Sequence, residues 1–260
     1  MSTPPPTQGK GTPTSVQQGR RAPRWWAEVL LVAVFYGAYD SVRGLIHGDA
    51  DEAIRHGAAL LRLERLFAIG IEHPLNNHLE NLAVLAVPAC FFYASAHFLV
   101  TPAVMLWAFR FHPHRYRTAR TVLAVLTAAA LLGFWLYPTA PPRLLPGAGF
   151  HDTLAAYSGW GWWSKSDSAP RALASLANQF AAMPSLHVAW AMWCGVTVFR
   201  YAKNWTLRAV AGAYPVVTGL VVLGTANHYL LDVVAGVAMW WVADVAVRCW
   251  AARRPIRLAD

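Results

Sequence analysis

The stretch "AAMPSLHVAWAMW", residues 181–193, turns from polar to apolar where a membrane-spanning helix is expected to begin. Pro184 suits the first position of a helix, because it has no amide hydrogen to leave unpaired there. Ser185 and the free backbone amides of that first turn can bind an anion, helped by the helix dipole. His187 lies within the same turn. The stretch therefore predicts an apolar helix whose first turn carries polar chemistry.

The same pattern returns in "TANHYLLDVVAG", residues 225–236, where His228 and Asp232 head another apolar run. Residues four apart share one face of a helix. Asp232 can then accept a hydrogen bond from one ring nitrogen of His228. That bond fixes the tautomer of the imidazole and leaves its other nitrogen free as a nucleophile.

The composition of the chain is that of a membrane protein. Of its 260 residues, 56% are hydrophobic and 13% are charged, and 13 are Trp. The apolar share is above, and the charged share below, that of an ordinary soluble domain. We expect an all-α polytopic membrane protein with one domain at 25–250. A disordered cytoplasmic tail is expected at 1–24 and a short basic cytoplasmic tail at 251–260.

Six runs approach the ~20 apolar residues that cross a bilayer and predict a six-transmembrane-helix bundle. They lie near 25–45, 92–110, 119–137, 184–201, 207–224 and 227–249. The apolar stretch 78–91 is short and interrupted by Pro88, so we expect it to be interfacial or a buried approach to the second helix. Within 46–78, apolar residues recur at helical spacing between Arg and Glu. This predicts an additional interfacial amphipathic helix, which fits a covering element as well as a substrate gate.

The basic residues set the orientation. With the N-terminus in the cytoplasm, 15 of the 22 Lys and Arg residues fall on the inner side. The seven on the outer side are Arg43, Arg55, Arg62, Arg65, Arg143, Lys165 and Arg171. The positive-inside rule favours this arrangement, with both termini cytoplasmic in a plasma membrane. Basic clusters between apolar runs fit anchoring at a membrane face, so no nucleic acid partner is expected despite the net charge of +9.

Two other residue types have simple interpretations. The three cysteines form no CxxC pair and are interpreted as small core residues: Cys90, Cys194 and Cys249. Aromatic residues in the outer segment 138–183 are expected at the level of the lipid headgroups: Tyr157, Trp160, Trp162 and Trp163.

The orientation brings polar helix ends together at the outer face. The first helix ends there at "YDSVR" (39–43), the third ends at "YPTAPPR" (137–143), and the fourth and sixth begin there with the two quoted motifs. Arg143 offers a planar fork suited to phosphate oxygens. A lone His near a membrane boundary is usually structural. Two His and one Asp beside an Arg and a helix N-terminus indicate a functional site.

These motifs resemble the signatures of the type-2 phosphatidic acid phosphatase superfamily, over roughly residues 119–249. The form "YPTAPPR…AAMPSLHVAWA…NHYLLDVVAG" is most similar to its inositol phosphorylceramide synthase-like, inositolphosphotransferase branch. The resemblance implies a phosphohistidine mechanism without metal or cofactor. His228 would be the nucleophile, Asp232 its orienting partner and His187 the general acid and base. Ser185 and Arg143 would hold phosphate oxygens.

The chain departs from the general superfamily pattern in its phosphate clamp. The Ser-Arg pair that precedes the third-motif His is replaced by Val221 and Val222, and the first-motif Lys by Leu136. Four residues are candidates to replace the missing phosphate ligands. We rank Arg43 first, and the others are Arg171, Lys165 and His97. His97 is expected about one turn inside the second helix, near the outer face.

The expected function is a membrane lipid phosphatase or phosphotransferase, with a phospholipid or prenyl phosphate as substrate and the bilayer as partner. Hydrolysis and transfer to an alcohol share the phosphohistidine step, so the motifs leave them open, as they do the lipid and the oligomeric state. One alternative is a haem or electron-transfer protein with His187 and His228 as axial ligands. Another is a transporter, for which Asp244 is the one charge deep in the sixth helix.

Overall fold

The computed structural model describes residues 26, 30, 37, 49–163 and 179–253. The expected first membrane helix therefore lies outside the described residues, apart from the three isolated positions 26, 30 and 37. Both expected tails also lie outside them, except for residues 251–253, which belong to the last helix. Arg43, Lys165 and Arg171 also lie outside them.

The described chain is helical, as expected from its apolar runs. The helices are α2 (Ala50–Leu66), α3 (Glu72–Glu80), α4 (Ala83–Phe111), α5 (Pro113–Leu136), α6 (Thr153–Ala156), α7 (Leu186–Tyr201), α8 (Trp205–Gly224) and α9 (Leu230–Arg253), with a 3₁₀ turn, η1, at Pro142–Leu144. Strand pairing in the described part is limited to one isolated parallel bridge, between Thr139 and Ala181.

Four of these helices are long and apolar enough to cross a membrane: α4, α5, α8 and α9. The expected count of six spans is therefore not confirmed. One of the other two falls at 25–45, outside the described residues. The other, expected at 184–201, is α7, whose 16 residues are fewer than the ~20 of a typical span.

Helix α4 begins earlier than the sequence predicts. It runs for 29 residues from Ala83, so the C-terminal part of the stretch 78–91 is its first two turns and not a separate approach. Pro88 and Pro102 both lie inside the helix. Proline removes one backbone hydrogen bond, yet the rest of the backbone has no better partner than the helix itself in an apolar environment. Pro88 therefore does not end the helix.

The segment 46–78 forms two helices instead of one. Asp49 caps α2 by accepting a hydrogen bond from the Asp51 amide, and Asp51 and Glu52 add negative charge at the positive end of the helix dipole. The amphipathic pattern is confirmed, and its buried face packs on the bundle. At Gly57, an added Cβ would lie 2.6 Å from both the carbonyl oxygen of Ala140 and the hydroxyl of Tyr229. Only glycine allows this close approach.

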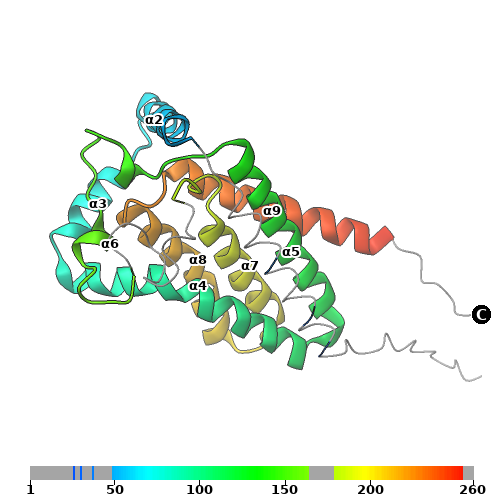
Figure 1. Cartoon of the computed structure of the whole chain (residues 1–260). Helices are drawn as coiled ribbons and strands as arrows, with labels where there is room; N and C mark the ends of the chain where they lie inside the picture. Colours follow the sequence, from blue (N-terminus) through cyan, green and yellow to red (C-terminus); the bar gives the residue numbers. More distant parts are fainter. Residues whose placement is uncertain (1–25, 27–29, 31–36, 38–48, 164–178, 254–260) are drawn as a thin grey trace, which may run out of the picture.

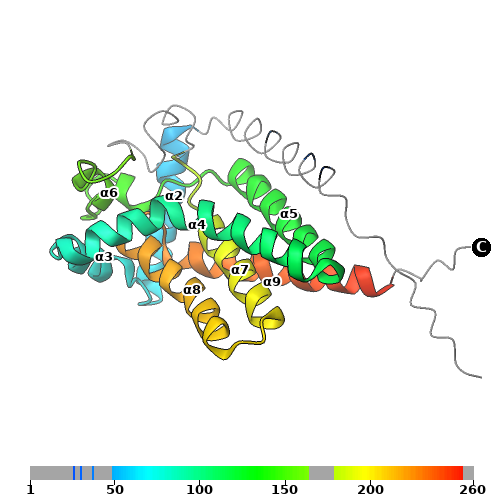
Figure 2. The ribbon, with the colours of Figure 1, turned by 90° about the horizontal axis from the view of Figure 1, so that it is seen from below.

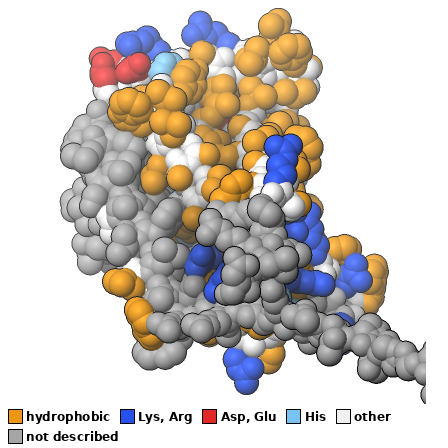
Figure 3. Space-filling view, turned by 90° about the vertical axis from the view of Figure 1, so that its right-hand side faces the viewer, with side chains coloured by type: hydrophobic (Ala, Val, Ile, Leu, Met, Phe, Trp, Pro, Cys, Tyr) orange, Lys and Arg blue, Asp and Glu red, His pale blue; other side chains and the backbone are white. Residues whose placement is uncertain are grey.

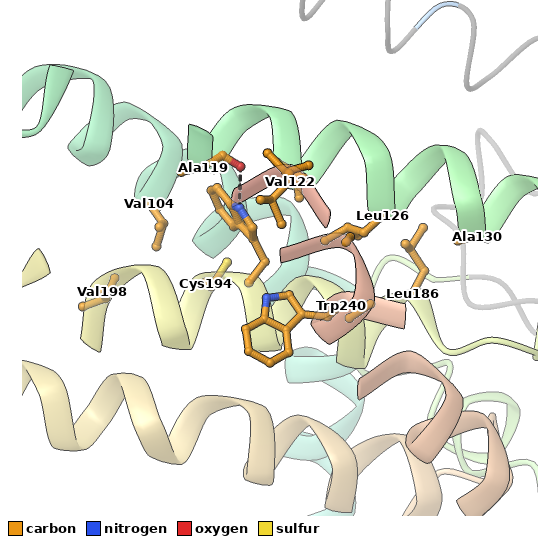
Figure 4. Packing of buried hydrophobic residues seen from close by; sticks show 14 of the residues in the cluster. Val104, Ala119, Val122, Leu126, Ala130, Leu186, Cys194, Val198 and Trp240 are labelled. Carbon is orange, nitrogen blue, oxygen red and sulfur yellow. Dashed lines mark hydrogen bonds between the residues drawn. The ribbon is translucent and has the colours of Figure 1, made fainter. Parts of the chain in front are cut away.

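The main core lies between α5, α7 and α9. Figure 4 shows Val122 and Leu126 of α5 beside Leu186 of α7 and Trp240 of α9. The indole of Trp193 donates a 2.8 Å hydrogen bond to the carbonyl of Ala119, which pairs its one polar atom inside this core. Cys90 and Cys194 are buried as expected, whereas Cys249 is exposed.

One buried charge joins α7 to α9. The carboxylate of Asp244 accepts two 2.9 Å hydrogen bonds from Arg200 and one of 2.8 Å from Arg248. A carboxylate paired in this way is a structural clamp between helices. Because Asp244 is paired with two arginines, it is not the unpaired charge that ion coupling in a transporter would need.

The short helices lie at one end of the bundle. Figures 1 and 2 both show α3 and α6 at this end and the C-terminal half of α9 at the opposite end. Figure 3 shows hydrophobic side chains over much of the described surface of one face, with acidic side chains confined to one edge. Trp160 and Trp162 are exposed, but Trp163 is buried and donates a hydrogen bond to the Leu154 carbonyl, so it is a core residue.

The predicted orientation is testable by cysteine labelling. Gly159 is exposed and has open space around it, whereas Ser158 beside it is buried. In a chain whose three native cysteines are replaced, Gly159→Cys should react with an impermeant thiol reagent in intact cells. The matched control is Lys203→Cys in the exposed turn between α7 and α8, which should react only after the cells are lysed. Reversal of the two results would overturn the orientation.

Candidate active site

The site is assembled around the extended segment that follows α5. The Thr139 amide donates to the carbonyl of Phe180 at 2.7 Å, and the Ala182 amide donates to the carbonyl of Thr139 at 3.2 Å. These two bonds hold the segment 180–182 against the segment after α5. The carbonyl of Ala182 is thereby fixed, and it accepts a hydrogen bond from His228.

The same segment is bonded to α2 and to the turn before α9. The Ala140 amide donates to the carbonyl of Ala53 at 3.0 Å, and the Ala140 carbonyl accepts a 2.9 Å hydrogen bond from the Tyr229 hydroxyl. The Arg143 amide donates to the carbonyl of Ala226 at 3.0 Å. The "YPTAPPR" segment thus joins three parts of the chain that are far apart in sequence.

His228 lies in the turn before α9, not on a helix face as the spacing predicts, because the helix begins only at Leu230. Its Nδ1 lies 2.9 Å from the carbonyl oxygen of Ala182 and 3.3 Å from Oδ2 of Asp232. A carbonyl oxygen only accepts, so Nδ1 carries the hydrogen. In the neutral ring, Nε2 then has the free electron pair that a nucleophile needs.

Asp232 is completely buried in the first turn of α9. Its Oδ2 also accepts a 2.9 Å hydrogen bond from the Tyr229 amide, while its Oδ1 has no partner among the described residues. Its carbonyl accepts a 3.0 Å hydrogen bond from the Ser185 amide. Asp232 therefore fixes His228 through its side chain and the start of α7 through its backbone.

The first turn of α7 is capped by Ser185, whose Oγ accepts from the Val188 amide at 3.4 Å. Pro184 precedes this cap and does not occupy the first helical position, which Leu186 takes. Ser185 is fully buried. An added Cβ on Gly236 would lie 2.5 Å from the Ser185 carbonyl oxygen, so α9 crosses the start of α7 at backbone contact.

His187 lies beside His228 among aromatic rings. The two imidazole centroids are 5.6 Å apart, edge to face. Tyr93 stacks on His187 at 4.6 Å, and His97 meets it edge to face at 4.5 Å. His97, the one expected clamp substitute among the described residues, therefore contacts His187. It lies in the middle of α4, which begins at Ala83, and not about one turn from the start of the helix as predicted.

A shallow indentation, with a volume of only about 10 Å³, lies beside His187 between α4 and α8. It is lined by the rings of Tyr93, His97 and Tyr214, and also by Val222. Val222 stands at the position where the general superfamily pattern has Arg, so the wall of this indentation is apolar where a cation would otherwise lie.

Arg143 is held close to His228 but is already bonded. Its Nε donates to the Asn227 side chain and its Nη1 to Oδ2 of Asp152, both at 3.0 Å. Its side chain is almost completely buried. The guanidinium therefore neutralises Asp152 and fixes the residue that precedes His228.

Several polar residues of the site were not predicted. Glu64 and Glu72 are buried next to the start of α9, and the side chain of Asn76 bonds to the backbone of His151 and Gly224. Glu64 could have been noticed in the sequence, because it continues the Gly57 and Leu60 positions along the apolar face of α2. Asn76 and Asp152 stand in no pattern that marks them.

The two alternative functions gain no specific support. A haem between His187 and His228 needs a flat cavity between the imidazoles, but these rings contact each other, and Tyr93 stacks on His187. Among the described residues, no three His, Cys, Asp or Glu side chains gather as metal ligands. Asp244 is paired with two arginines.

Comparison with known proteins places the whole arrangement within one family model. The model described as the PAP2 superfamily matches residues 58–246, well over half of the chain. The matched range includes Arg143 and both His motifs, and it begins within α2. No curated protein and no solved structure matches significantly.

The close crossing at Gly236 predicts a selective loss of stability. Gly236→Ala should destabilise the protein by roughly 1–3 kcal/mol, because the new methyl overlaps the Ser185 carbonyl and must push the two helices apart. Gly212→Ala on exposed α8 is the matched control, with open space around it, and should stabilise slightly. Thermal unfolding in detergent measures both. Equal melting temperatures for the two variants would contradict the close crossing.

Proposed function

Because this chain belongs to the PAP2 superfamily, we propose that it transfers a phosphoryl group from a lipid through a phosphohistidine at His228. Membership of this superfamily indicates a phosphatase-type lipid function in a membrane. One observation supports the proposed reaction most directly. The Nδ1 of His228 is bonded to the Ala182 carbonyl and to Asp232, and the ring of His187 lies 5.6 Å away. A nucleophile, its orienting carboxylate and a second imidazole are thus adjacent.

In the first step, Nε2 of His228 attacks phosphorus while the bond from phosphorus to the ester oxygen breaks. Protonated His187 gives its proton to the departing oxygen, which leaves as an alcohol. The positive charge that develops on the His228 ring is stabilised by Asp232, as in other oriented His–Asp pairs.

In the second step, neutral His187 takes the proton of the acceptor as the acceptor oxygen attacks phosphorus. The N–P bond of His228 breaks, and the product carries the phosphate. His187 is then protonated again, and the cycle is complete. Water as acceptor gives hydrolysis, whereas an alcohol gives transfer.

For the phosphate oxygens we propose Arg143 and Ser185, with the amides of the first turn of α7. Arg143 has one remaining amino group, Nη2, beyond its bonds to Asp152 and Asn227. Arg43 is the second choice, followed by Arg171 and Lys165. His97 is a further candidate because it contacts His187.

The substrate we propose is a membrane phospholipid or a prenyl phosphate, reached from the bilayer on the outer face of a plasma membrane. From the motif form "YPTAPPR…PSLH…NHYLLD" we propose the inositolphosphotransferase-like branch, with either water or an alcohol as the acceptor.

The proposed reaction predicts turnover that depends on His228. Purified protein should convert at least one member of a panel of phospholipids and prenyl phosphates, measured as free phosphate and, with alcohol acceptors, as transferred product. His228→Ala should abolish turnover, and Asp232→Asn should lower it by up to about 10⁴-fold, because the neutral amide cannot stabilise the imidazolium. The control is His114→Ala, at an exposed position near the start of α5, which should keep wild-type turnover.

Wild-type protein quenched in an alkaline denaturant should also carry acid-labile, alkali-stable phosphate that His228→Ala lacks. Full activity of folded His228→Ala would remove the nucleophile assignment. Product formation in which only the alcohol, never water, accepts phosphate would decide for transfer.

Because Arg143 pairs with Asp152, variants of both residues can show whether Arg143 binds the substrate phosphate or only supports the fold through this ion pair. Arg143→Ala should lose nearly all turnover, and Arg143→Lys should recover only part, because an ammonium cannot copy the planar contact. Asp152→Asn keeps the cap on the Ala155 amide but removes the charge partner of Arg143. It should therefore retain most turnover. If Asp152→Asn loses as much as Arg143→Ala while both remain folded, Arg143 acts as an ion-pair partner and not as a phosphate ligand.

A further inference from the structure

Two buried carboxyl groups stand outside the catalytic set. Glu64 is in the last turn of α2 and Glu72 begins α3, and their exposed fractions are 0% and 1%. The two side chains lie within hydrogen-bonding reach of each other. Oε2 of each receives no hydrogen bond from any other described group. Buried acids are rare unless paired, so this arrangement calls for a physical reason.

The pair is bonded to the catalytic turn. Oε1 of Glu64 accepts a 2.7 Å hydrogen bond from the Leu231 amide, in the first turn of α9. Amides of a first helical turn have no partner within the helix. Asp232 takes the Tyr229 amide and Glu64 takes that of Leu231, so two carboxyl groups from different helices hold the backbone on both sides of Leu230.

The charge balance requires a proton on the pair. Two ionised carboxylates cannot hydrogen-bond to each other, and like charges this close disfavour double ionisation. Burial, followed by the contact with Glu72, raises the pKa of Glu64 to about 8. The titratable groups that face the pair include Asp232 and Tyr229, neither of which brings a positive charge. A single proton leaves one negative charge at the positive end of α9.

We propose that Glu64 and Glu72 are positioning residues, which share one proton and hold the turn of His228 and Asp232 in place through the Leu231 amide. This inference rests on the proposed function for its effect on turnover. The proton reduces the repulsion between the pair and the Asp232 carboxylate, and it leaves Oε1 of Glu64 available to accept the hydrogen bond of the Leu231 amide. The α2–α3 corner thereby becomes part of the active-site frame.

The shared proton has a consequence for stability that needs no substrate. The folded protein keeps a proton on Glu64 up to about pH 8, whereas the unfolded chain loses it near the ordinary value of 4.5. The folded state thus binds more protons across this interval. Its stability should therefore fall as the pH rises from about 4.5 to about 8 and change little above that.

The experiment compares Glu64→Gln, Glu64→Ala and Glu52→Gln, the last being a partly exposed position on the same helix. Thermal unfolding of each full-length protein in detergent is followed from pH 5 to 9, and phosphate release is measured on the best lipid of the panel. Glu64→Gln keeps the acceptor for Leu231 and should stay within a few-fold of wild-type turnover, with a flatter pH dependence of unfolding. Glu52→Gln should keep wild-type turnover and the wild-type pH dependence of unfolding, with at most a small uniform loss of stability from the weaker dipole contact.

Glu64→Ala removes the acceptor and should lower kcat by about ten- to a hundredfold with little change in KM, because it displaces the catalytic turn without touching substrate. A near-wild-type kcat in Glu64→Gln, together with a lowered kcat in Glu64→Ala, would show that Glu64 positions the turn of His228. The same pH slope in wild type and Glu64→Gln would overturn the shared proton, and wild-type kcat in Glu64→Ala would overturn positioning. If Glu64→Ala does not fold, the Gln variant and its pH slope still decide the shared proton. No turnover by the wild-type protein would overturn the proposed function alone, because unfolding is measured without substrate.

Discussion

Everything around the site depends on the backbone hydrogen bonds of the short extended segment after α5. Its amides and carbonyls at Thr139 and Ala140 bond to α2, to residues 180–182 and to Tyr229. Buried backbone groups must find partners, and a segment without regular structure finds them only in other parts of the chain. This requirement brings together pieces as far apart in the sequence as Ala53 and Tyr229, which are separated by 176 residues. The prolines of "YPTAPP" suit the role, because they fix the backbone and reduce the number of amides to be paired.

The geometry of the proposed catalytic groups is set by hydrogen bonds that take no part in the proposed reaction. His228 is oriented by a backbone carbonyl as much as by Asp232, and Asp232 also fixes the start of α7 through the Ser185 amide. A buried polar network is rigid when each member is satisfied and costly when one is not. Hydrogen bonds thus join the capped start of α7, the turn before α9 and the α2–α3 corner to one another.

The sequence predicted the helical class and the grouping of the motifs because both rest on local signals, hydrophobic runs and polar helix starts. It misplaced what depends on contacts between distant residues. The spacing of His228 and Asp232 was interpreted as a helix face, but Leu230 begins the helix, and the contact forms because Asp232 reaches back to the preceding turn. Pro88 was expected to interrupt a helix that tertiary packing and an apolar surround keep intact. Glu64 carries a weak signal, a charge on an apolar face, whose meaning becomes clear only when Glu72 is seen beside it.

The length of α7 has a consequence for where in the bilayer the proposed reaction would take place. Its 16 residues rise only about 24 Å, against a hydrocarbon core of ~30 Å. If Arg200 and its charged partners lie at one polar boundary, His187 at the other end of α7 lies short of the opposite boundary. A lipid phosphate would then have to move below the plane of its neighbours, or the bilayer would have to thin around the protein, before the phosphate and His187 could meet. Membrane thickness would become a physical variable of the proposed reaction, as much as the identity of the lipid.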